Sequence, residues 1–293
     1  MNNLRIAHIS DLHFCKSEFY IFNKPSLKLW RPKRPVELYN ALWECRNFSA
    51  SRVKSLIDKV NDLDVDIVVA TGDFTLTGKK REYRMAVEAL KSLKALLVAV
   101  PGNHDVWSES SWQERRFKEY MGWACPGGDL PWLWDDPHGR ARIIGLDSSK
   151  YSRSPTSATG VLSSESLDFL RKHGPTRPEG SKLVVALHHH VLLENTASPP
   201  ALQRLYADRM RLKNAEQFWD AAHSAGVDLV LHGHHHDAYR SRHLGVAIHC
   251  VGSGGVSTDT AGKTARFDIV EVGPGDIIAT TWVYSNGAWE NNS

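Results

Sequence analysis

Val-Pro-Gly-Asn-His-Asp, at Val100–Asp105, directly follows the apolar run Leu96–Val100. An aliphatic run that stops at Pro-Gly predicts a buried strand ending in a sharp turn. The turn carries Asn103, His104 and Asp105, which are an oxygen ligand, an imidazole that titrates near neutral pH, and a carboxylate able to orient that imidazole. Polar groups are costly to fix at the end of a buried strand, so this trio indicates a functional site.

The composition is that of a globular protein with a sizeable core. The chain has 293 residues, of which 42% are hydrophobic and 24% charged. A net charge of +3 is too small to indicate nucleic-acid binding by itself. No apolar run reaches the roughly 18 residues that a membrane helix needs, and the N-terminus has no signal-peptide pattern, so we expect a cytoplasmic protein.

Cysteine and histidine are distributed differently. The cysteines lie far apart and form no C-x-x-C pair: Cys15, Cys45, Cys125 and Cys250. We therefore expect free, mostly buried thiols, Cys15 among them, rather than a disulfide framework or a thiolate zinc site. Histidines instead cluster at His188–His190 and His234–His236, and histidine-rich strand ends indicate metal ligation.

Apolar runs alternate with amphipathic stretches over most of the chain. Strands are expected at 4–9, 66–70, 96–100, 142–146, 182–187 and 227–231. Helices are expected at 53–63, 82–94, 109–120, 163–173 and 215–224. This alternation predicts βαβ units and a parallel sheet.

The C-terminal third changes period. The strand-like runs 246–251, 266–272 and 277–284 have no helices between them, which predicts a second, more antiparallel sheet packed on the first. The expected fold is α/β: two packed mixed sheets flanked by helices, an αββα sandwich, formed by a single domain over residues 1–293. Insertions are expected at about 14–48 and 106–140.

Polar clusters follow the predicted strands directly. They are Asp11 with His13, Asp73, Asn103 with His104, His188, and His234 with His236. Residues just past the carboxyl ends of parallel strands meet at one edge of a sheet, so these clusters are expected to converge. Asp11 and His13 are two residues apart and would point the same way on an extended chain.

The donor set predicts a metal centre. Its oxygen and nitrogen ligands are too numerous for one ion and suit two ions that share a carboxylate, about 3.5–4 Å apart. Imidazole and carboxylate ligands without thiolate favour manganese, iron or zinc over calcium. Two such ions lower the pKa of a bridging water and clamp an in-line displacement at phosphorus.

The blocks D-x-H, G-D, G-N-H-D, H-H and G-H-x-H, in this order from about Ile6 to Gly254, resemble the calcineurin-like metallophosphoesterase superfamily. The resemblance implies a two-sheet sandwich and a dinuclear metal-dependent phosphohydrolase. Such an enzyme cleaves a phosphodiester, phosphomonoester or pyrophosphate bond by in-line attack of a metal-bridging hydroxide. A phosphodiesterase acting on a small or nucleotide-type substrate is the main expectation.

The resemblance also implies roles for individual residues. One metal would be held by Asp11, His13, Asp73 and His236, and the other by Asp73, Asn103, His188 and His234, with Asp73 bridging. His104, oriented by Asp105, would protonate the leaving oxygen or stabilise charge on the phosphoryl group. His189 is an alternative to His188 as ligand, whereas His232 and His235 would lie behind the ligands or face the substrate.

Alternatives remain open for the substrate and for the insertions. One is a pyrophosphatase of a nucleotide-linked lipid precursor, of the UDP-2,3-diacylglucosamine type, and a rival from another class is a non-catalytic binding scaffold. The insertions at 14–48 and 106–140 either form local cores or line the substrate site. Trp30, Arg31, Lys33 and Arg34 lie together, so 14–48 could form a basic, apolar rim for a lipid-linked substrate or for peripheral contact with the inner face of a membrane.

Overall fold

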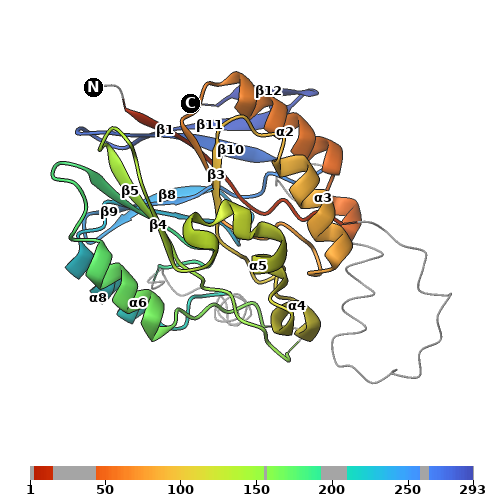
Figure 1. Ribbon diagram of the computed structural model, residues 1–293. Helices are drawn as coiled ribbons and strands as arrows, with labels where there is room; N and C mark the ends of the chain where they lie inside the picture. Colours follow the sequence, from red (N-terminus) through yellow and green to blue (C-terminus); the bar gives the residue numbers. More distant parts are fainter. Residues whose placement is uncertain (1–2, 16–43, 155–156, 193–209, 258–263, 293) are drawn as a thin grey trace, which may run out of the picture.

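Two six-stranded sheets lie face to face with helices outside them in the computed structural model (Figure 1). The structure describes residues 3–15, 44–154, 157–192, 210–257 and 264–292. Most of the insertion at 14–48, including Trp30 and its basic neighbours, therefore lies outside the described residues, as do residues 193–209 of the loop after the His188 strand.

The first sheet has the strand order β12-β11-β10-β1-β2-β3. Its strands are β1 (Leu4–Ile9), β2 (Ile67–Ala70), β3 (Leu96–Ala99), β10 (Arg266–Val272), β11 (Ile278–Ser285) and β12 (Ala288–Asn291). The first three are parallel to one another, and β10 pairs antiparallel with β1 in the register Leu4↔Val272. The parallel strands are short, apolar and almost entirely buried, as expected for strands covered on both faces.

The second sheet has the order β4-β5-β6-β7-β9-β8. Its strands are β4 (Trp132–Asp135), β5 (Ala141–Gly145), β6 (Lys182–Ala186), β7 (Leu229–His232), β8 (Tyr239–His243) and β9 (Val246–Cys250). Strands β5, β6, β7 and β9 are parallel, and the antiparallel strands β4 and β8 form the two edges.

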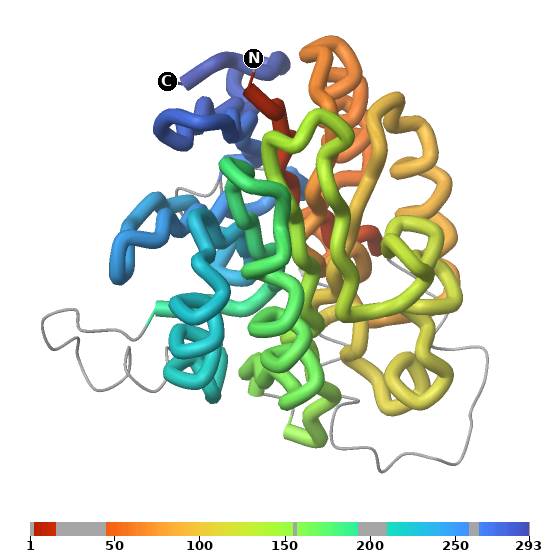
Figure 2. Tube along the Cα trace, turned by 60° about the vertical axis from the view of Figure 1, so that its left-hand side comes forward, coloured from red at the N-terminus to blue at the C-terminus, as the bar shows by residue number. Residues whose placement is uncertain are grey.

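Helices cover the outer faces of both sheets (Figure 2). The α-helices are α2 (Ala50–Asp62), α3 (Lys80–Leu90), α4 (Glu109–Gln113), α5 (Arg116–Met121), α6 (Ser164–His173) and α8 (Ala215–Ala225). Short 3-10 turns are η2 (Glu44–Asn47), η3 (Gly122–Ala124) and η4 (Pro126–Gly128). Among the described helices, none has the length and apolar character needed to cross a membrane.

Buried apolar residues form two clusters. One extends from α2 and α3 through the first sheet to the inner face of the second sheet. The other lies between the second sheet and the helix pair α6 and α8. These layers confirm the predicted αββα sandwich of two mixed sheets flanked by helices.

Three details of the predicted architecture were wrong. The predicted runs 266–272 and 277–284, which form β10 and β11, belong to the first sheet, because β10 pairs with β1, while the second sheet is built from residues 132–250. The helix expected at 109–120 is two short helices, α4 and α5, which are separated at Arg115 by a left-handed φ of 49°. The edge strands β4, β8 and β12 were not predicted.

The expectation for the cysteines was wrong for one pair. Cys15 and Cys45 form a disulfide with a Cα–Cα distance of 5.8 Å, whereas Cys125 and Cys250 are free and buried as predicted. The fold brings the loop after β1 against η2, and a separation of 30 residues in sequence gave no sign of that approach.

Candidate metal centre

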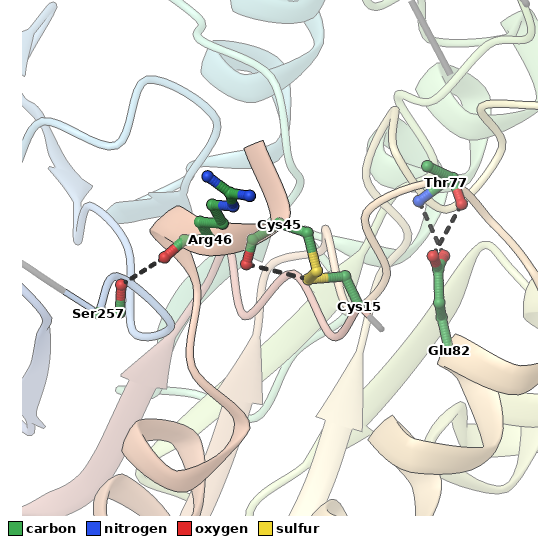
Figure 3. The surroundings of a disulfide bond; sticks show 6 residues. All are labelled: Cys15, Cys45, Arg46, Thr77, Glu82 and Ser257. Atoms are coloured by element: carbon green, nitrogen blue, oxygen red, sulfur yellow. Dashed lines mark hydrogen bonds between the residues drawn. A yellow bond between two sulfur atoms is a disulfide. The ribbon is translucent and has the colours of Figure 1, made fainter. Parts of the chain in front are cut away.

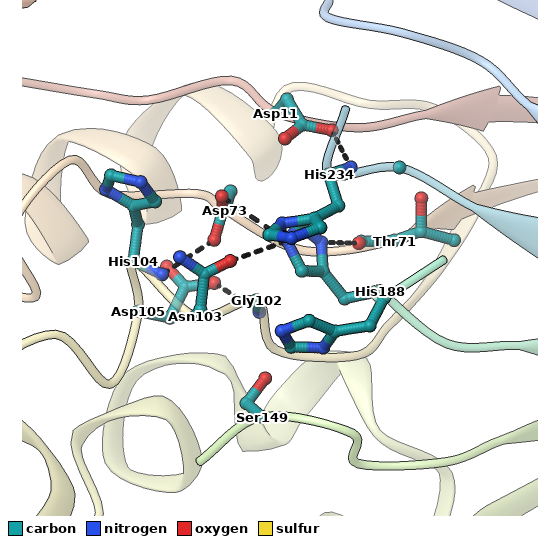
Figure 4. Close-up of polar contacts among 12 residues, drawn as sticks. Asp11, Thr71, Asp73, Gly102, Asn103, His104, Asp105, Ser149, His188 and His234 are labelled. Atoms are coloured by element: carbon teal, nitrogen blue, oxygen red, sulfur yellow. Dashed lines mark hydrogen bonds and ion pairs between the residues drawn. The ribbon is translucent and has the colours of Figure 1, made fainter. Parts of the chain in front are cut away.

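The polar side chains predicted from the strand ends converge between the two sheets (Figure 4). Those of the first sheet follow β1, β2 and β3, and those of the second sheet follow β6 and β7. The residues are Asp11, His13, Asp73, Asn103, His188, His234 and His236. Their donor atoms form two neighbouring clusters.

The first cluster contains Asp11, His13 and His236. The Nε2 atoms of His13 and His236 are 2.9 Å apart, and Asp11 Oδ1 lies 3.2 Å from His236 Nε2 and 3.7 Å from His13 Nε2. Ligands bound at about 2.1 Å to one ion lie roughly 3 Å from one another, so these atoms surround one ion-sized position.

The second cluster contains Asp73, His188 and His234, with Asn103 beside them. His188 Nε2 lies 3.1 Å from His234 Nδ1, 3.1 Å from Asn103 Oδ1 and 3.4 Å from Asp73 Oδ2. The other ring nitrogen, His188 Nδ1, lies 2.6 Å from the Thr71 carbonyl oxygen and donates to it. That bond fixes the tautomer and presents Nε2 to the cluster, as in histidine ligands of metals.

Asp73 joins the two clusters. Its Oδ2 atom lies 3.4 Å from His188 Nε2 and 3.7 Å from His13 Nε2. Its Oδ1 atom accepts a 2.8 Å hydrogen bond from the backbone N–H of His104. One carboxylate oxygen is therefore held by the backbone while the other faces both clusters.

The backbone at these positions is strained. Five of the predicted ligands have left-handed φ values between 48° and 81°: Asp11, His13, Asp73, His234 and His236. Such conformations cost about 1–3 kcal/mol each and persist where the surrounding structure imposes them, often at functional sites. Asp11 and His13 thus do not lie on an extended chain; they reach the same cluster through two strained turns.

Two glycines allow the loops to meet. Gly72 has a φ of 99°, and a Cβ on it would lie 2.6 Å from the Gly102 nitrogen. A Cβ on Gly102 would collide with the Asp73 carboxylate. The absence of a side chain at Gly72 and Gly102 therefore allows Asp73 to pack against the Val100–Asp105 turn.

The carboxylates at the centre are ionised. Burial opposes ionisation of Asp11 and Asp73, but neighbouring imidazoles outweigh it: chiefly His13 and His236 for Asp11, and His188 and His104 for Asp73. The pKa of each carboxyl is consequently held below its usual range. Two buried anions among imidazole nitrogens form an environment suited to divalent cations.

The donor set fits two metal ions. Asp11 Oδ1 is buried and, within the described part of the chain, has no hydrogen-bond partner, although it points toward His13 and His236. Buried polar atoms are normally satisfied, so groups left open at a cluster of donors point to a bound cation.

His104 is oriented differently from our expectation. Its Nδ1 donates a 2.7 Å hydrogen bond to the Leu76 carbonyl, and its ring stacks on Trp107 at a centroid distance of 5.1 Å. The Asp105 carboxylate instead accepts from the backbone N–H groups of Phe74, Thr75 and Gly102, and from the Thr75 hydroxyl. Asp105 thereby fastens the Asp73 loop to the turn that carries His104.

The neighbouring histidines lie behind the clusters. His189 Nδ1 is 2.8 Å from Ser148 Oγ, and His232 Nε2 is 2.7 Å from the Tyr239 hydroxyl. His235 packs its ring against that of His190, with centroids 4.7 Å apart. Geometry thus favours His188 over His189 as a ligand.

The site opens on one side. Most ligands are buried, whereas His236 is 21% exposed and His104 is half-buried. Half-buried Phe48 borders this side, with its ring centroid 4.3 Å from that of His13. Neither Phe48 nor Trp107 was predicted at the site, because nothing in their sequence spacing marks contact with the histidines.

Comparison with known proteins identifies a family and relatives similar in sequence. Residues 4–238 match the sequence model of a family described as calcineurin-like phosphoesterase. A probable glycerophosphodiester phosphodiesterase of Arcobacter nitrofigilis is 30% identical over 186 residues, which are 63% of this chain and 56% of that protein. A 3′,5′-cyclic adenosine monophosphate phosphodiesterase of Haemophilus influenzae is 28% identical over 201 residues, 68% of this chain and 65% of that protein. The chain thus spans less than two thirds of either relative.

Solved structures share the fold. A dimetal phosphatase from Danio rerio superposes with a TM-score of 0.60 at 15% identity, covering 95% of this chain and 99% of that one. A purple acid phosphatase from yellow lupin gives a TM-score of 0.64 at 12% identity, covering 98% of this chain and 52% of that one.

Proposed function

The chain belongs to the calcineurin-like phosphoesterase family, and we propose that it is a dinuclear metal-dependent phosphodiesterase acting on a small or nucleotide-type substrate. The observation that carries the proposal is the position of Asp73, whose Oδ2 atom faces His13 in one cluster and His188 in the other. A carboxylate shared between two imidazole clusters is the arrangement that a two-metal hydrolytic site requires.

Manganese, iron or zinc are the proposed ions. Asp11, His13, Asp73 and His236 would hold one ion, and Asp73, Asn103, His188 and His234 the other. When bound, the ions supply Lewis-acid polarisation of the phosphoryl oxygens and activation of water. The tautomer of His188, fixed by the Thr71 carbonyl, supports its assignment as a ligand.

His104 is the proposed proton carrier. Its Nδ1 atom donates to the Leu76 carbonyl, so Nε2 is the atom that would give a proton to the leaving oxygen or stabilise its charge. The half-buried position of His104 on the open side of the site supports contact with substrate. Asp105 would act indirectly, because its hydrogen bonds hold together the two loops that carry Asp73 and His104.

The relatives narrow the substrate class. The two named above are described as acting on a glycerophosphodiester and on a cyclic nucleotide, which favours a small phosphodiester for this chain. They give no support to a lipid-linked pyrophosphate substrate. The complete set of predicted ligands, together with His104, argues against a non-catalytic scaffold. The cytoplasmic location and any membrane contact through 14–48 stay predictions.

A substrate panel on manganese-loaded protein tests the function. It contains an aryl phosphodiester, 3′,5′-cyclic nucleotides, glycerophosphodiesters, an aryl phosphomonoester and a nucleotide-linked lipid precursor. We expect turnover of the diesters that chelation abolishes and manganese restores. In Asp73→Asn, metal affinity and activity should each fall by about a hundredfold or more. Asp220→Asn, a substitution of the same kind at an exposed position of α8, should change neither. Full metal occupancy without turnover of any phosphoester would instead favour the scaffold.

A further inference from the structure

The Cys15–Cys45 disulfide joins the loop after β1 to η2 (Figure 3). Cys15 is two residues after His13. Cys45 belongs to η2 and is three residues before Phe48. The bond therefore ties the loop that carries a predicted ligand to the segment that carries Phe48.

Phe48 contacts two imidazoles of the first cluster. Its ring centroid lies 4.3 Å from that of His13 with an interplanar angle of 42°, and 5.8 Å from that of His236 with an angle of 90°. His236 is the most exposed of these ligands. An aromatic ring packed against both imidazoles limits their rotation on the side where the site is open.

The segment around Phe48 also has backbone anchors of its own. Phe48 pairs with Val256, and the N–H of Ser257 donates to the Asn47 carbonyl at 2.8 Å. The Ser257 hydroxyl donates to the Arg46 carbonyl at 2.9 Å. These contacts tie η2 to the segment after β9 that contains Val256 and Ser257, whereas the disulfide ties it to the His13 loop.

We propose that Phe48 is a positioning residue for His13 and His236, and that the Cys15–Cys45 disulfide holds it in place, so that the affinity of the site for metal depends on the redox state of this pair. The inference rests on the proposed metal centre. A low-molecular-weight dithiol is the reductant. One thiolate of the reductant attacks the disulfide and forms a mixed disulfide, which releases one cysteine. The second thiol of the reductant then attacks the mixed disulfide and releases the other cysteine. Two electrons thus pass to the pair, so that Cys15 and Cys45 become thiols and the reductant becomes a cyclic disulfide.

The expected effect is a loss of metal affinity rather than of folding. Groups that orient histidine ligands typically change metal affinity by about 10–100-fold when they are removed. We therefore expect the Kd for Mn²⁺ to rise about tenfold on reduction.

The experiment measures Mn²⁺ binding by calorimetry on the full chain after oxidation, and after reduction and anaerobic desalting. Alkylation followed by mass spectrometry verifies the state of Cys15 and Cys45, and circular dichroism verifies the fold. The double variant Cys15→Ser/Cys45→Ser should bind Mn²⁺ as weakly as the reduced protein and should not respond to reductant. Cys125→Ala, which leaves the disulfide intact, should respond as the unmodified chain does.

Substitution of Phe48 separates the ring from the disulfide. Phe48→Ala should weaken Mn²⁺ binding about tenfold in the oxidised, folded protein, and Phe48→Tyr should restore it. Equal affinity of the oxidised and reduced chains overturns the role of the disulfide, and unchanged affinity in Phe48→Ala overturns that of the ring. In both cases the oxidised chain would still bind metal and hydrolyse diesters, whereas failure of the oxidised chain to bind metal would contradict the proposed function itself.

Discussion

Asp73 uses its two carboxylate oxygens for different purposes. One accepts from the backbone of His104, and the other faces imidazoles from both sheets. Its own backbone is in the left-handed region, and the residue packed beside it must be Gly102. At the residue scale, the site is a set of locally unfavourable conformations that neighbouring hydrogen bonds keep in place.

His104 should be needed for turnover but not for metal binding. Its ring lies at the edge of the His13 ring, and its Nδ1 is bonded to the Leu76 carbonyl. His104→Ala should therefore retain both metals and slow kcat by about 10²–10⁴-fold, most strongly for diesters with poor leaving groups. Metal analysis and a series of aryl diesters of graded leaving-group pKa measure the two effects. If the variant loses its metals, His104 is a ligand and our assignment of its role is wrong.

The residues that could be predicted are those whose chemistry is visible in the sequence. Asp11, Asp73 and His188 stand directly after apolar runs, which is a pattern that a sequence displays. The partner of His104 was not predictable, because a backbone carbonyl such as that of Leu76 leaves no mark in the sequence. The contact of Phe48 with His13 was not predictable either, because only the tertiary fold brings the two side chains together.

At the scale of elements, the predicted ligands follow the ends of strands, and the helices pack on the sheets. Strands β1, β2, β3, β6 and β7 were predictable because each is a short apolar run. Strand β8 carries the sequence Tyr-Arg-Ser-Arg-His and β12 is largely exposed, so neither has the apolar pattern of a buried strand. Edge strands need only one neighbour, and their sequences can be polar.

Glu82 stabilises the beginning of α3. Its carboxylate is buried and accepts from the backbone N–H and the hydroxyl of Thr77, each at 2.8 Å (Figure 3). It also accepts from the backbone N–H of Lys79 at 3.2 Å. Glu82→Ala leaves these donors buried and should lower the free energy of unfolding by about 2 kcal/mol. Glu88→Ala, on the exposed face of the same helix, should change it by less than about 0.5 kcal/mol. Urea unfolding measures both, and equal effects would contradict the capping role.

His249 should make the protein acid-sensitive. It lies in β9 opposite Arg240, and burial, with Arg240 and Arg242 nearby, lowers its pKa from 6.5 to about 4. The unfolded chain therefore binds a proton that the folded chain excludes, so stability falls as the pH decreases through 6.5 toward 4. Between pH 7 and pH 4, the free energy of unfolding should therefore decrease by about 3 kcal/mol less in His249→Gln than in the unmodified chain.

Urea unfolding at several pH values tests the His249 prediction. A chelator is included so that metal release does not contribute. His138→Gln, a substitution at an exposed histidine, serves as the control and should leave the pH dependence unchanged. An unchanged pH dependence in His249→Gln would mean that other groups account for the acid sensitivity.

At the scale of the whole molecule, the candidate site lies at the junction of the two sheets. Asp11, Asp73 and Asn103 follow strands of the first sheet, whereas His188 and His234 follow strands of the second. The sandwich was predictable from the alternation of elements, but the membership of each sheet was not. Strand β10 pairs with β1 from the opposite end of the chain, and an apolar run does not identify its partner.

Because the ligands come from both sheets, bound metal should stabilise the entire sandwich. Metal that binds only the folded chain adds about 2.7 kcal/mol at a free concentration one hundred times Kd, which should raise Tm by roughly 5 °C or more. Calorimetry of the chelated protein with and without added Mn²⁺ measures the shift. In Asp73→Asn the shift should nearly vanish, since the residue that serves both clusters has lost its charge. A shift of the same size in this variant would place the stabilising metal outside the junction between the sheets.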